Sequence, residues 1–384
     1  MMEPSPALLV LDDGACFEGM ACGARAEATG EAVFVTGMTG YQEVLTDPSY
    51  HGQIVVFTAA HMGNYGVSPH DDEAPFFGAN GVVFHTLFTG ADGMSFPHWR
   101  SCGSLNNRLA EAGVSGICGV DTRALTLHLR RHGARNAIIS ATDLDRSSLL
   151  RRVRDLPSMQ GQDLVRHVTT DKRHSLVPSP VVSARQAISG KEPRKPLKIA
   201  VLDYGVKHSI LRHLLRCNMQ LEVWPAASLA KDILASGPDG VLLSNGPGDP
   251  EPCVQAIQTV RQLIGRVPLF GICLGHQLLA LALGGKTYKL PFGHHGLNHP
   301  VKDLQTGRVA ITSQNHGFCV DPNSLPRTAQ ATHWNLNDDT LEGMTCTHAP
   351  AFSVQFHPEA APGTWDAYGL FDRFRDVIVD AKGM

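Results

Sequence analysis

The residues of this chain that could do covalent chemistry centre on Cys273. The cysteine lies in the turn Gly271-Ile-Cys-Leu-Gly275, between a short apolar run that begins at Val267 and an apolar, helix-favouring segment that stops at Gly284-Gly285. This pattern predicts a strand, a sharp turn and a helix, with the thiol at the apex. A tight elbow leaves no room for a β-carbon on either side, which accounts for the two glycines. Because the start of a helix favours a thiolate, the pattern predicts a nucleophile rather than a buried, inert cysteine.

A cysteine nucleophile needs a base, and the base needs a group that orients it. The segment Ala351-Phe-Ser-Val-Gln-Phe-His-Pro-Glu359 offers both. Residues 351–356 predict a buried strand, and His357 and Glu359 are two residues apart, so in extended geometry they point to the same side. Glu359 could then orient the imidazole while the other ring nitrogen faces the thiol. The sequence therefore predicts a Cys-His-Glu triad of Cys273, His357 and Glu359.

Three segments together resemble the triad-type, or class I, glutamine amidotransferases. They are the elbow from Gly271 to Gln277, the His357-Pro-Glu359 segment, and the loop Ser244-Asn-Gly-Pro-Gly-Asp-Pro250. The loop leaves a predicted strand end, and its glycines let the backbone approach a ligand. The resemblance implies that the substrate is L-glutamine.

The N-terminal half resembles one branch of this family, the small, glutamine-hydrolysing subunits of carbamoyl phosphate synthetase. The resemblance rests on residues 36–50, 61–66 and 119–126, which by themselves indicate only loops with special backbone needs, and it extends over nearly the whole chain. The sequence departs from the usual pattern of that branch at residues 58–61, 84–96 and 360–366, which bears on partner contacts and regulation.

The resemblance also implies a set of glutamine-binding residues. Backbone N–H groups of Gly246 and Leu274 would form an oxyanion hole, worth roughly 3 to 4 kcal/mol per donor in comparable sites. Gln277 follows the nucleophile by one helical turn, so it would bind substrate from the same side. A stretch from Ile311 to Cys319 would hold the amino-acid end of glutamine. The remaining members of the set are Ser49, which would reach across from the N-terminal half, and Gly248, Asn315, Gly317 and Phe318.

The composition is that of a globular protein with a nearly neutral charge balance. The chain has 384 residues, enough for two domains with separate cores, and 43% of them are apolar and 18% charged. A formal net charge of -3 gives no bulk attraction to nucleic acid or a membrane surface, and no apolar stretch reaches the roughly 18 residues of a membrane span. Nine scattered cysteines without CxxC spacing fit reduced thiols, so we expect a cytoplasmic protein without a metal site.

The order of predicted elements divides the chain into an N-terminal domain, 1–152, a polar linker, 153–196, and a C-terminal domain, 197–384. The N-terminal domain is strand-rich, with helices arriving late. We expect its second helix, about 122–131, to be capped by Asp121 and to bury one face through Leu125, Leu127 and Leu129. Its predicted strands are 7–12, 31–36, 53–58 and 81–85, and its earlier helix is about 104–111.

The C-terminal domain alternates strands with helices. Strand patterns at 197–203, 220–224 and 239–244 are followed by helical patterns, and the strand of the elbow comes next. This alternation predicts an α/β fold with a doubly wound, mostly parallel sheet, whose active loops lie at the carboxyl ends of its strands.

The resemblance implies a complete reaction cycle shared with a second protein. Glutamine would acylate Cys273, ammonia would leave, and water would hydrolyse the thioester to glutamate. The ammonia would pass to a carbamoyl phosphate synthetase large subunit that joins it to bicarbonate with two ATP, for arginine biosynthesis, pyrimidine biosynthesis or a specialised pathway. We expect a heterodimer or higher oligomer with that subunit, and no cofactor on this chain, since it lacks a GxxxxGK[ST] loop; ATP and metal belong to the large subunit.

Three alternatives differ from this interpretation in substrate or in activity. Another class I amidotransferase subunit would lack the N-terminal resemblance. A cysteine peptidase or deglycase-like hydrolase could share the C-terminal fold, although Gln277 and the 244–250 loop favour glutamine. A silent regulatory protein would bind the large partner without an intact triad.

Overall fold

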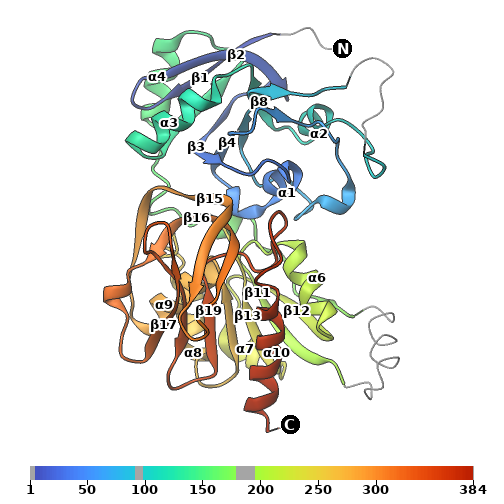
Figure 1. Ribbon diagram of the computed structural model, residues 1–384, viewed down its shortest axis with the longest axis vertical. Helices are drawn as coiled ribbons and strands as arrows, with labels where there is room; N and C mark the ends of the chain where they lie inside the picture. Colours follow the sequence, from blue (N-terminus) through green and yellow to red (C-terminus); the bar gives the residue numbers. More distant parts are fainter. Residues whose placement is uncertain (1–4, 91–97, 179–194, 384) are drawn as a thin grey trace. The chain divides into compact units, whose positions relative to one another are not determined.

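The computed structural model divides the described residues into two compact units (Figure 1). The structure describes three stretches of the chain, 5–90, 98–178 and 195–383. The first unit comprises the chain up to Gln162 together with Leu290–Gly296, and the second comprises Asp163–Lys289 together with Leu297 onward. Of the predicted linker, residues 163–178 fold with the second unit, whereas residues 179–194 lie outside the described part of the chain.

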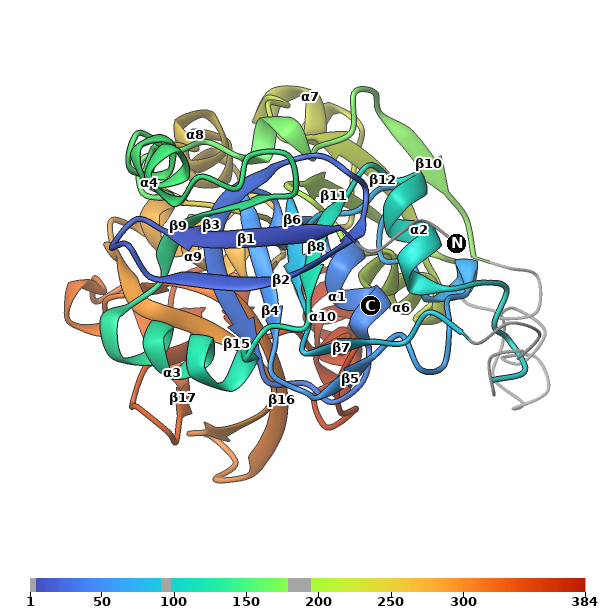
Figure 2. The same ribbon diagram turned by 90° about the horizontal axis from the view of Figure 1, so that it is seen from above.

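The first unit is built on a closed barrel, whose strands Figure 2 shows from above. Parallel pairing joins β3 to β4, β4 to β6 and β6 to β8, while β1 pairs antiparallel with β2 and β9. The barrel order is β1 (Pro6–Leu11), β2 (Cys16–Gly23), β8 (Ser115–Cys118), β6 (Gly81–Val83), β4 (Gln53–Phe57), β3 (Ala28–Val35) and β9 (Arg135–Ser140). The strands predicted from the apolar runs are therefore present, within a few residues of the expected bounds.

Helices pack on the outside of these strands and complete the apolar cores of the first unit. The helix α2 contacts β2, α3 contacts β3 and β4, and α4 contacts β1 and β9. Their bounds are α1 (Tyr41–Thr46), α2 (Leu105–Glu111), α3 (Thr122–His132) and α4 (Arg146–Arg154), and two short strands, β5 (His61–Met62) and β7 (Thr86–Leu87), pair beside them.

The prediction for α3 is right about its cap and wrong about one leucine. The Asp121 carboxylate accepts a hydrogen bond from the Ala124 N–H at 2.9 Å, as an N-cap should. Leu125 and Leu129 are fully buried, but Leu127 is 36% exposed. The reason is helical geometry: residues four apart share a face, whereas a residue two positions along points about 200° around the helix.

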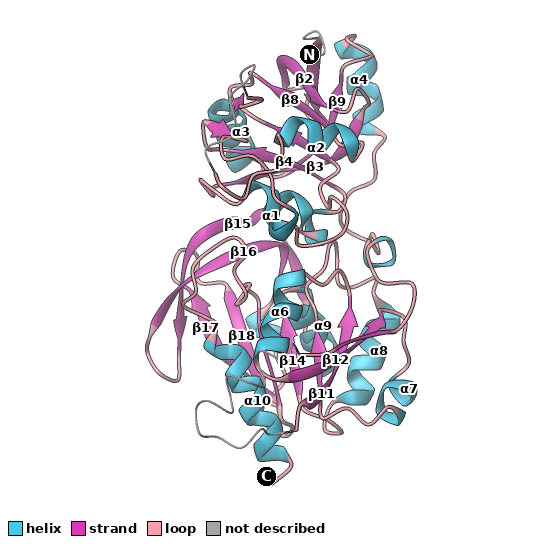
Figure 3. Ribbon diagram, turned by 90° about the vertical axis from the view of Figure 1, so that its right-hand side faces the viewer, coloured by secondary structure: helices cyan, strands magenta, loops and turns pink. Residues whose placement is uncertain are grey.

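The second unit contains a long mixed sheet with a parallel centre (Figure 3). The strands β12, β11, β13, β14 and β19 pair in parallel, which confirms the predicted doubly wound core. Antiparallel strands that the alternation did not predict continue it on both sides. The sheet order is β10 (His174–Leu176), β12 (Met219–Pro225), β11 (Leu197–Asp203), β13 (Gly240–Leu243), β14 (Leu269–Ile272), β19 (Ala351–Val354), β18 (Leu341–Cys346), β17 (Ala329–Asn335), β15 (Thr287–Asp303) and β16 (Val309–Val320).

Alternating residues of the central strands fill two separate cores, one on each face of this sheet. In β11, Ile199 and Val201 pack with α6 and α10, while Ala200 and Leu202 pack with α7, α8 and α9. This period of two is expected for a strand buried on both faces. The helix bounds are α6 (His208–Arg216), α7 (Ala230–Ala235), α8 (Val254–Leu263), α9 (Leu274–Leu283) and α10 (Gly369–Ala381).

Candidate active site

Cys273 occupies a strained corner between β14 and α9. Its backbone has φ 54 and ψ -105, a region that residues with a β-carbon rarely adopt. Main-chain hydrogen bonds fix this corner, because the Cys273 N–H donates to the Val354 carbonyl at 2.9 Å and the Cys273 carbonyl accepts from the Gln277 N–H at 3.2 Å. The strand, turn and helix predicted from the sequence are thus present, with the cysteine at the apex.

The two flanking glycines are required by close backbone packing. A β-carbon at Gly271 would lie 2.7 Å from the Gly275 carbonyl oxygen, and one at Gly275 would overlap the Leu243 carbonyl oxygen. The chain can therefore turn this tightly only because neither position carries a side chain.

His357 and Glu359 are close together and buried beside this corner. The His357 Nδ1 atom lies 2.7 Å from the Glu359 Oε1 atom, and the Cys273 side chain is close enough to the imidazole to raise its pKa. The strand β19 ends at Val354, two residues before its predicted end, and the His357 N–H instead donates to the Ser313 carbonyl at 2.9 Å. The structure therefore brings together the three residues that the sequence predicts as a triad.

Lys207 adds a positive charge to this group. Its Nζ atom lies 2.9 Å from the Glu359 Oε1 atom and donates to the Ala360 carbonyl at 2.8 Å, and both charged side chains are almost fully buried. Burial raises the pKa of Glu359, but the charge of Lys207 and then that of His357 lower it, to about 2. Glu359 is therefore held as a carboxylate.

The charged form of His357 is favoured in turn. Burial lowers the pKa of His357, while the Glu359 carboxylate and then the neighbouring Cys273 side chain raise it, with a net value of about 10. An imidazole in this setting is a strong proton acceptor for the neighbouring thiol. The geometry and the electrostatics together suit His357 as a general base beside a cysteine nucleophile.

Sequence reasoning missed Lys207, although its position offered a signal. It lies just after β11, at the carboxyl end of a central parallel strand, where active residues of such sheets gather. Asp203 shapes this turn by accepting hydrogen bonds from the Gly205 and Val206 N–H groups at 2.9 and 2.8 Å. The Lys207 N–H donates to the Asn245 amide oxygen at 3.2 Å, which ties the turn to the loop after β13.

The predicted oxyanion donors lie on a loop and on the first residue of a helix, which are packed against each other. Leu274 is the first residue of α9, so its N–H has no partner within the helix. A β-carbon at Gly246 would lie 2.8 Å from a methyl carbon of Leu274 and would overlap the Tyr204 carbonyl oxygen. Gly248 follows in the same loop with φ 84, a conformation that favours glycine.

Residues 311–319, which are predicted to hold the amino-acid end of glutamine, lie on β16, next to the nucleophile Cys273. The Cys273 thiol donates to the Asn315 carbonyl at 3.5 Å. Gln277 donates through its amide nitrogen to the Phe318 carbonyl at 2.7 Å and to the Gln355 amide oxygen at 3.1 Å. Both amide hydrogens of Gln277 are thereby used, which leaves its amide oxygen to accept from a substrate N–H. Gly317 lies between these residues on the same strand.

Ser49 belongs to the first unit. It is buried in a short 3-10 helix, Pro48–Tyr50, and its N–H donates to the Asp47 carboxylate at 2.9 Å. This turn is one that a capping aspartate builds locally. The role of Ser49 in the glutamine pocket stays a prediction.

Comparison with known proteins gives a family model for each half of the chain. Residues 200–377 match the family model described as glutamine amidotransferase class-I, and residues 9–139 match that of the carbamoyl-phosphate synthase small chain, CPSase domain. The carbamoyl phosphate synthase small chain of Syntrophotalea carbinolica is 50% identical to this chain over 97% of each. That of Thioalkalivibrio sulfidiphilus is 47% identical over 98% of each. The chain belongs to the carbamoyl phosphate synthase small chain family.

This membership gives the chain its activity. It is a glutamine amidotransferase, the glutamine-hydrolysing component of a carbamoyl phosphate synthase. The match over residues 9–139 favours this branch over the other class I amidotransferase subunits and over cysteine hydrolases that share only the C-terminal fold. No helix within the described ranges is long and apolar enough to cross a membrane.

The departures noted in the sequence fall in both units. Ala360 directly follows Glu359, has φ 57, and accepts the Lys207 hydrogen bond through its carbonyl. Residues 58–60 lie in the first unit between β4 and β5, and His61 is the first residue of β5. Of the segment 84–96, residues 91–96 lie outside the described part of the chain.

Proposed function

We propose that Cys273, His357 and Glu359 carry out glutamine hydrolysis through a covalent thioester. The Cys273 sulfur attacks the side-chain amide carbon of glutamine after its proton has passed to His357 Nε2. The oxyanion that forms accepts hydrogen bonds from the Gly246 and Leu274 N–H groups. His357 then protonates the leaving amine, and ammonia departs as the γ-glutamyl thioester forms.

Hydrolysis of the thioester uses the same base a second time. His357 takes a proton from water, the hydroxide adds to the thioester carbon, and collapse of the intermediate releases glutamate and restores the Cys273 thiol. Glu359 keeps the imidazole in one tautomer and stabilises its charged form, and Lys207 holds Glu359 in place. In this scheme Gln277, Gly248, Asn315, Gly317, Phe318 and Ser49 bind the substrate.

The observation that supports this mechanism best is the strained placement of Cys273 against His357. A backbone with φ 54 at a non-glycine residue is costly and persists only when surrounding contacts hold it. Here it aims the sulfur at an imidazole whose Nδ1 atom is 2.7 Å from a carboxylate. An inert structural cysteine has no need of either feature.

Substitution of the nucleophile tests the mechanism directly. Cys273→Ser should abolish glutamate release and the covalent glutamyl adduct that mass spectrometry detects after an acid quench. Cys346→Ser serves as the matched control, because Cys346 is also buried but lies in β18. Glutaminase activity that survives in Cys273→Ser would overturn the mechanism.

The proposed partner is a separate large subunit that uses ATP and receives the ammonia. The family match supports this partner, and we propose that the chain itself holds neither ATP nor a metal and works in the cytoplasm. Co-purification with the candidate large subunit, followed by assays of carbamoyl phosphate synthesis, tests the assignment. Glutamine and ammonia should both support synthesis, and a complex that uses ammonia but not glutamine would contradict it.

A further inference from the structure

A second buried carboxylate, Glu342 of β18, lies in the second unit and contacts residues 311–319, the stretch predicted to hold the amino-acid end of glutamine. Glu342 is fully buried, and its Oε1 atom accepts hydrogen bonds from the Gln314 amide nitrogen at 3.0 Å and from the Asn335 amide nitrogen at 2.8 Å. These two amides come from β16 and β17, so one carboxylate connects three strands. Burial of a carboxylate is energetically unfavourable, and buried carboxylates usually hold neighbouring groups in position or take part in a reaction.

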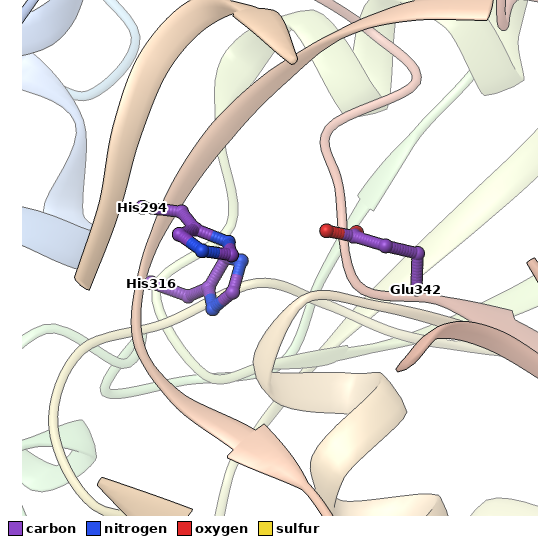
Figure 4. A group of neighbouring side chains, drawn as sticks. All are labelled: His294, His316 and Glu342. Carbon is purple, nitrogen blue, oxygen red and sulfur yellow. The ribbon is translucent and has the colours of Figure 1, made fainter. Parts of the chain in front are cut away.

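The contact with Gln314 extends to His316 on the same strand. The Gln314 amide oxygen lies 3.0 Å from the His316 Nε2 atom, and the His316 Nδ1 atom lies 2.9 Å from the Phe318 carbonyl oxygen. Figure 4 shows the Glu342 carboxylate and the His316 ring pointing toward one another. His294, also drawn there, belongs to the first unit. The orientation of Gln314 thus depends on the carboxylate of Glu342.

These contacts return to the active-site helix. The Phe318 carbonyl also accepts from the Gln277 amide nitrogen at 2.7 Å, and the same nitrogen donates to the Gln355 amide oxygen at 3.1 Å. The Gln355 N–H donates to the Glu342 main-chain carbonyl at 2.8 Å. The hydrogen bonds therefore form a closed circuit, which we call the amide network. Its members are Glu342, Gln314, His316, Phe318, Gln277 and Gln355.

We propose that Glu342 is a positioning residue for glutamine, acting through the amide network on β16 and on Gln277. This inference rests on the proposed function, since the groups that it positions are the predicted glutamine-binding residues. Side chains alternate along a strand, so Gln314 and His316 lie on one face of β16, and Asn315 and Gly317 lie on the other. Hydrogen bonds that fix the face of β16 with Gln314 and His316 also fix the opposite face, where Asn315 and Gly317 would contact the substrate. Glu342 itself touches no substrate.

The first test separates binding from chemistry. Glu342→Gln removes the charge of the carboxylate, so the two hydrogen bonds that its Oε1 atom accepts from Gln314 and Asn335 are no longer charge-assisted and the network loosens. We expect the KM for glutamine to rise about tenfold, the combined effect of weakening two such bonds, while kcat changes less than about twofold. The assay is glutaminase activity of the full chain, alone and with its large subunit.

A reciprocal exchange provides the rescue. The double variant Gln314→Glu with Glu342→Gln reverses the direction of the central hydrogen bond and keeps the net charge. The new carboxylate at position 314 still accepts from His316, and the new amide oxygen at position 342 still accepts from Asn335. The KM should return to within about threefold of the wild-type value, which simple loss of stability does not predict.

Two further variants keep the test decisive. Gln314→Ala breaks the path to His316 but leaves Asn335 on the carboxylate, so it should raise KM even if Glu342→Gln fails to fold. Ile378→Ala removes core volume at α10, which packs against Gly240 at the amino end of β13, away from the catalytic end of the sheet. It controls for general destabilisation and should leave KM unchanged.

The outcomes of the two proposals can be told apart. Wild-type protein without glutaminase activity, or activity that survives Cys273→Ser, would reject the proposed mechanism itself. An active wild-type enzyme would overturn the role of Glu342 if Glu342→Gln and Gln314→Ala left the KM unchanged. A double variant with the same defect as Glu342→Gln would also overturn it.

Discussion

Glu359 and Glu342 are both fully buried carboxylates of the second unit. The Lys207 and His357 side chains at the first can carry charge, whereas the Gln314 and Asn335 amides at the second are neutral. Glu359 contacts Lys207 and His357, which carry or accept a positive charge. Glu342 accepts hydrogen bonds from the amides of Gln314 and Asn335. Ionic partners shift pKa values and so prepare a proton transfer, whereas amides neither gain nor lose a proton near neutral pH. The same residue type therefore tunes chemistry in one region and fixes geometry in the other.

Removal of the catalytic base, His357, should have the largest effect on kcat. It should also give the largest difference between the region of Glu359 and that of Glu342. His357→Asn takes away the acceptor of the Cys273 proton, so kcat for glutamine hydrolysis should fall by about 10²–10⁴. Glu342→Gln should leave kcat nearly unchanged. Steady-state glutaminase assays of both variants make the comparison, and equal losses of kcat would break it.

Removal of the buried cation should show as a loss of stability. Lys207→Met leaves the Glu359 carboxylate with His357 as its charged partner, and breaking a buried ion pair in this way costs about 3–5 kcal/mol. The free energy of unfolding from denaturant titration measures the loss. Lys198→Met is the control, because Lys198 is an exposed lysine of the preceding strand β11. A loss no greater than that of the control would mean that the pair contributes nothing.

The pH dependence of stability should reveal the charges of Glu359 and His357. Because the pKa of Glu359 is lowered from 4.5 to about 2, its stabilisation is complete above pH 4.5 and is lost as the pH falls toward 2. Because the pKa of His357 is raised from 6.5 to about 10, its stabilisation is complete below pH 6.5 and is lost as the pH rises toward 10.

The measurable consequence is a difference between wild type and Glu359→Gln that varies with pH. The wild-type advantage in the free energy of unfolding should be greatest between pH 4.5 and 6.5 and should shrink on both sides. Denaturant titrations at several pH values would show this, and a difference that is constant with pH would contradict the assignment of charge to the pair.

The smallest effect should come from the second amide that contacts Glu342. Asn335→Ala removes one donor but leaves the path through Gln314 to His316 intact. We expect a loss of about 1–3 kcal/mol in the free energy of unfolding and little change in the KM for glutamine. Gln314→Ala should show the larger change in KM. A KM that rises as much in Asn335→Ala as in Gln314→Ala would mean that the carboxylate acts only as a strand connector.

Local patterns in the sequence predicted the nucleophile and most of the fold. Glycines at 271 and 275 identified the elbow because close packing there tolerates no β-carbon. The two-residue spacing of His357 and Glu359 was enough to place both side chains on one side of an extended segment, where the structure has them 2.7 Å apart. The exposed Leu127 shows the limit of counting apolar residues without their helical angle.

The sequence by itself determined the elements and the residues of the triad, because turns, strand alternation and helix caps depend on neighbours along the chain. Only the tertiary structure decided which distant side chains meet them. Lys207 and Glu359 are 152 residues apart along the chain, and Gln314 and Glu342 are 28 residues apart. Such pairings follow from the order in which strands join a sheet, and no local pattern encodes that order.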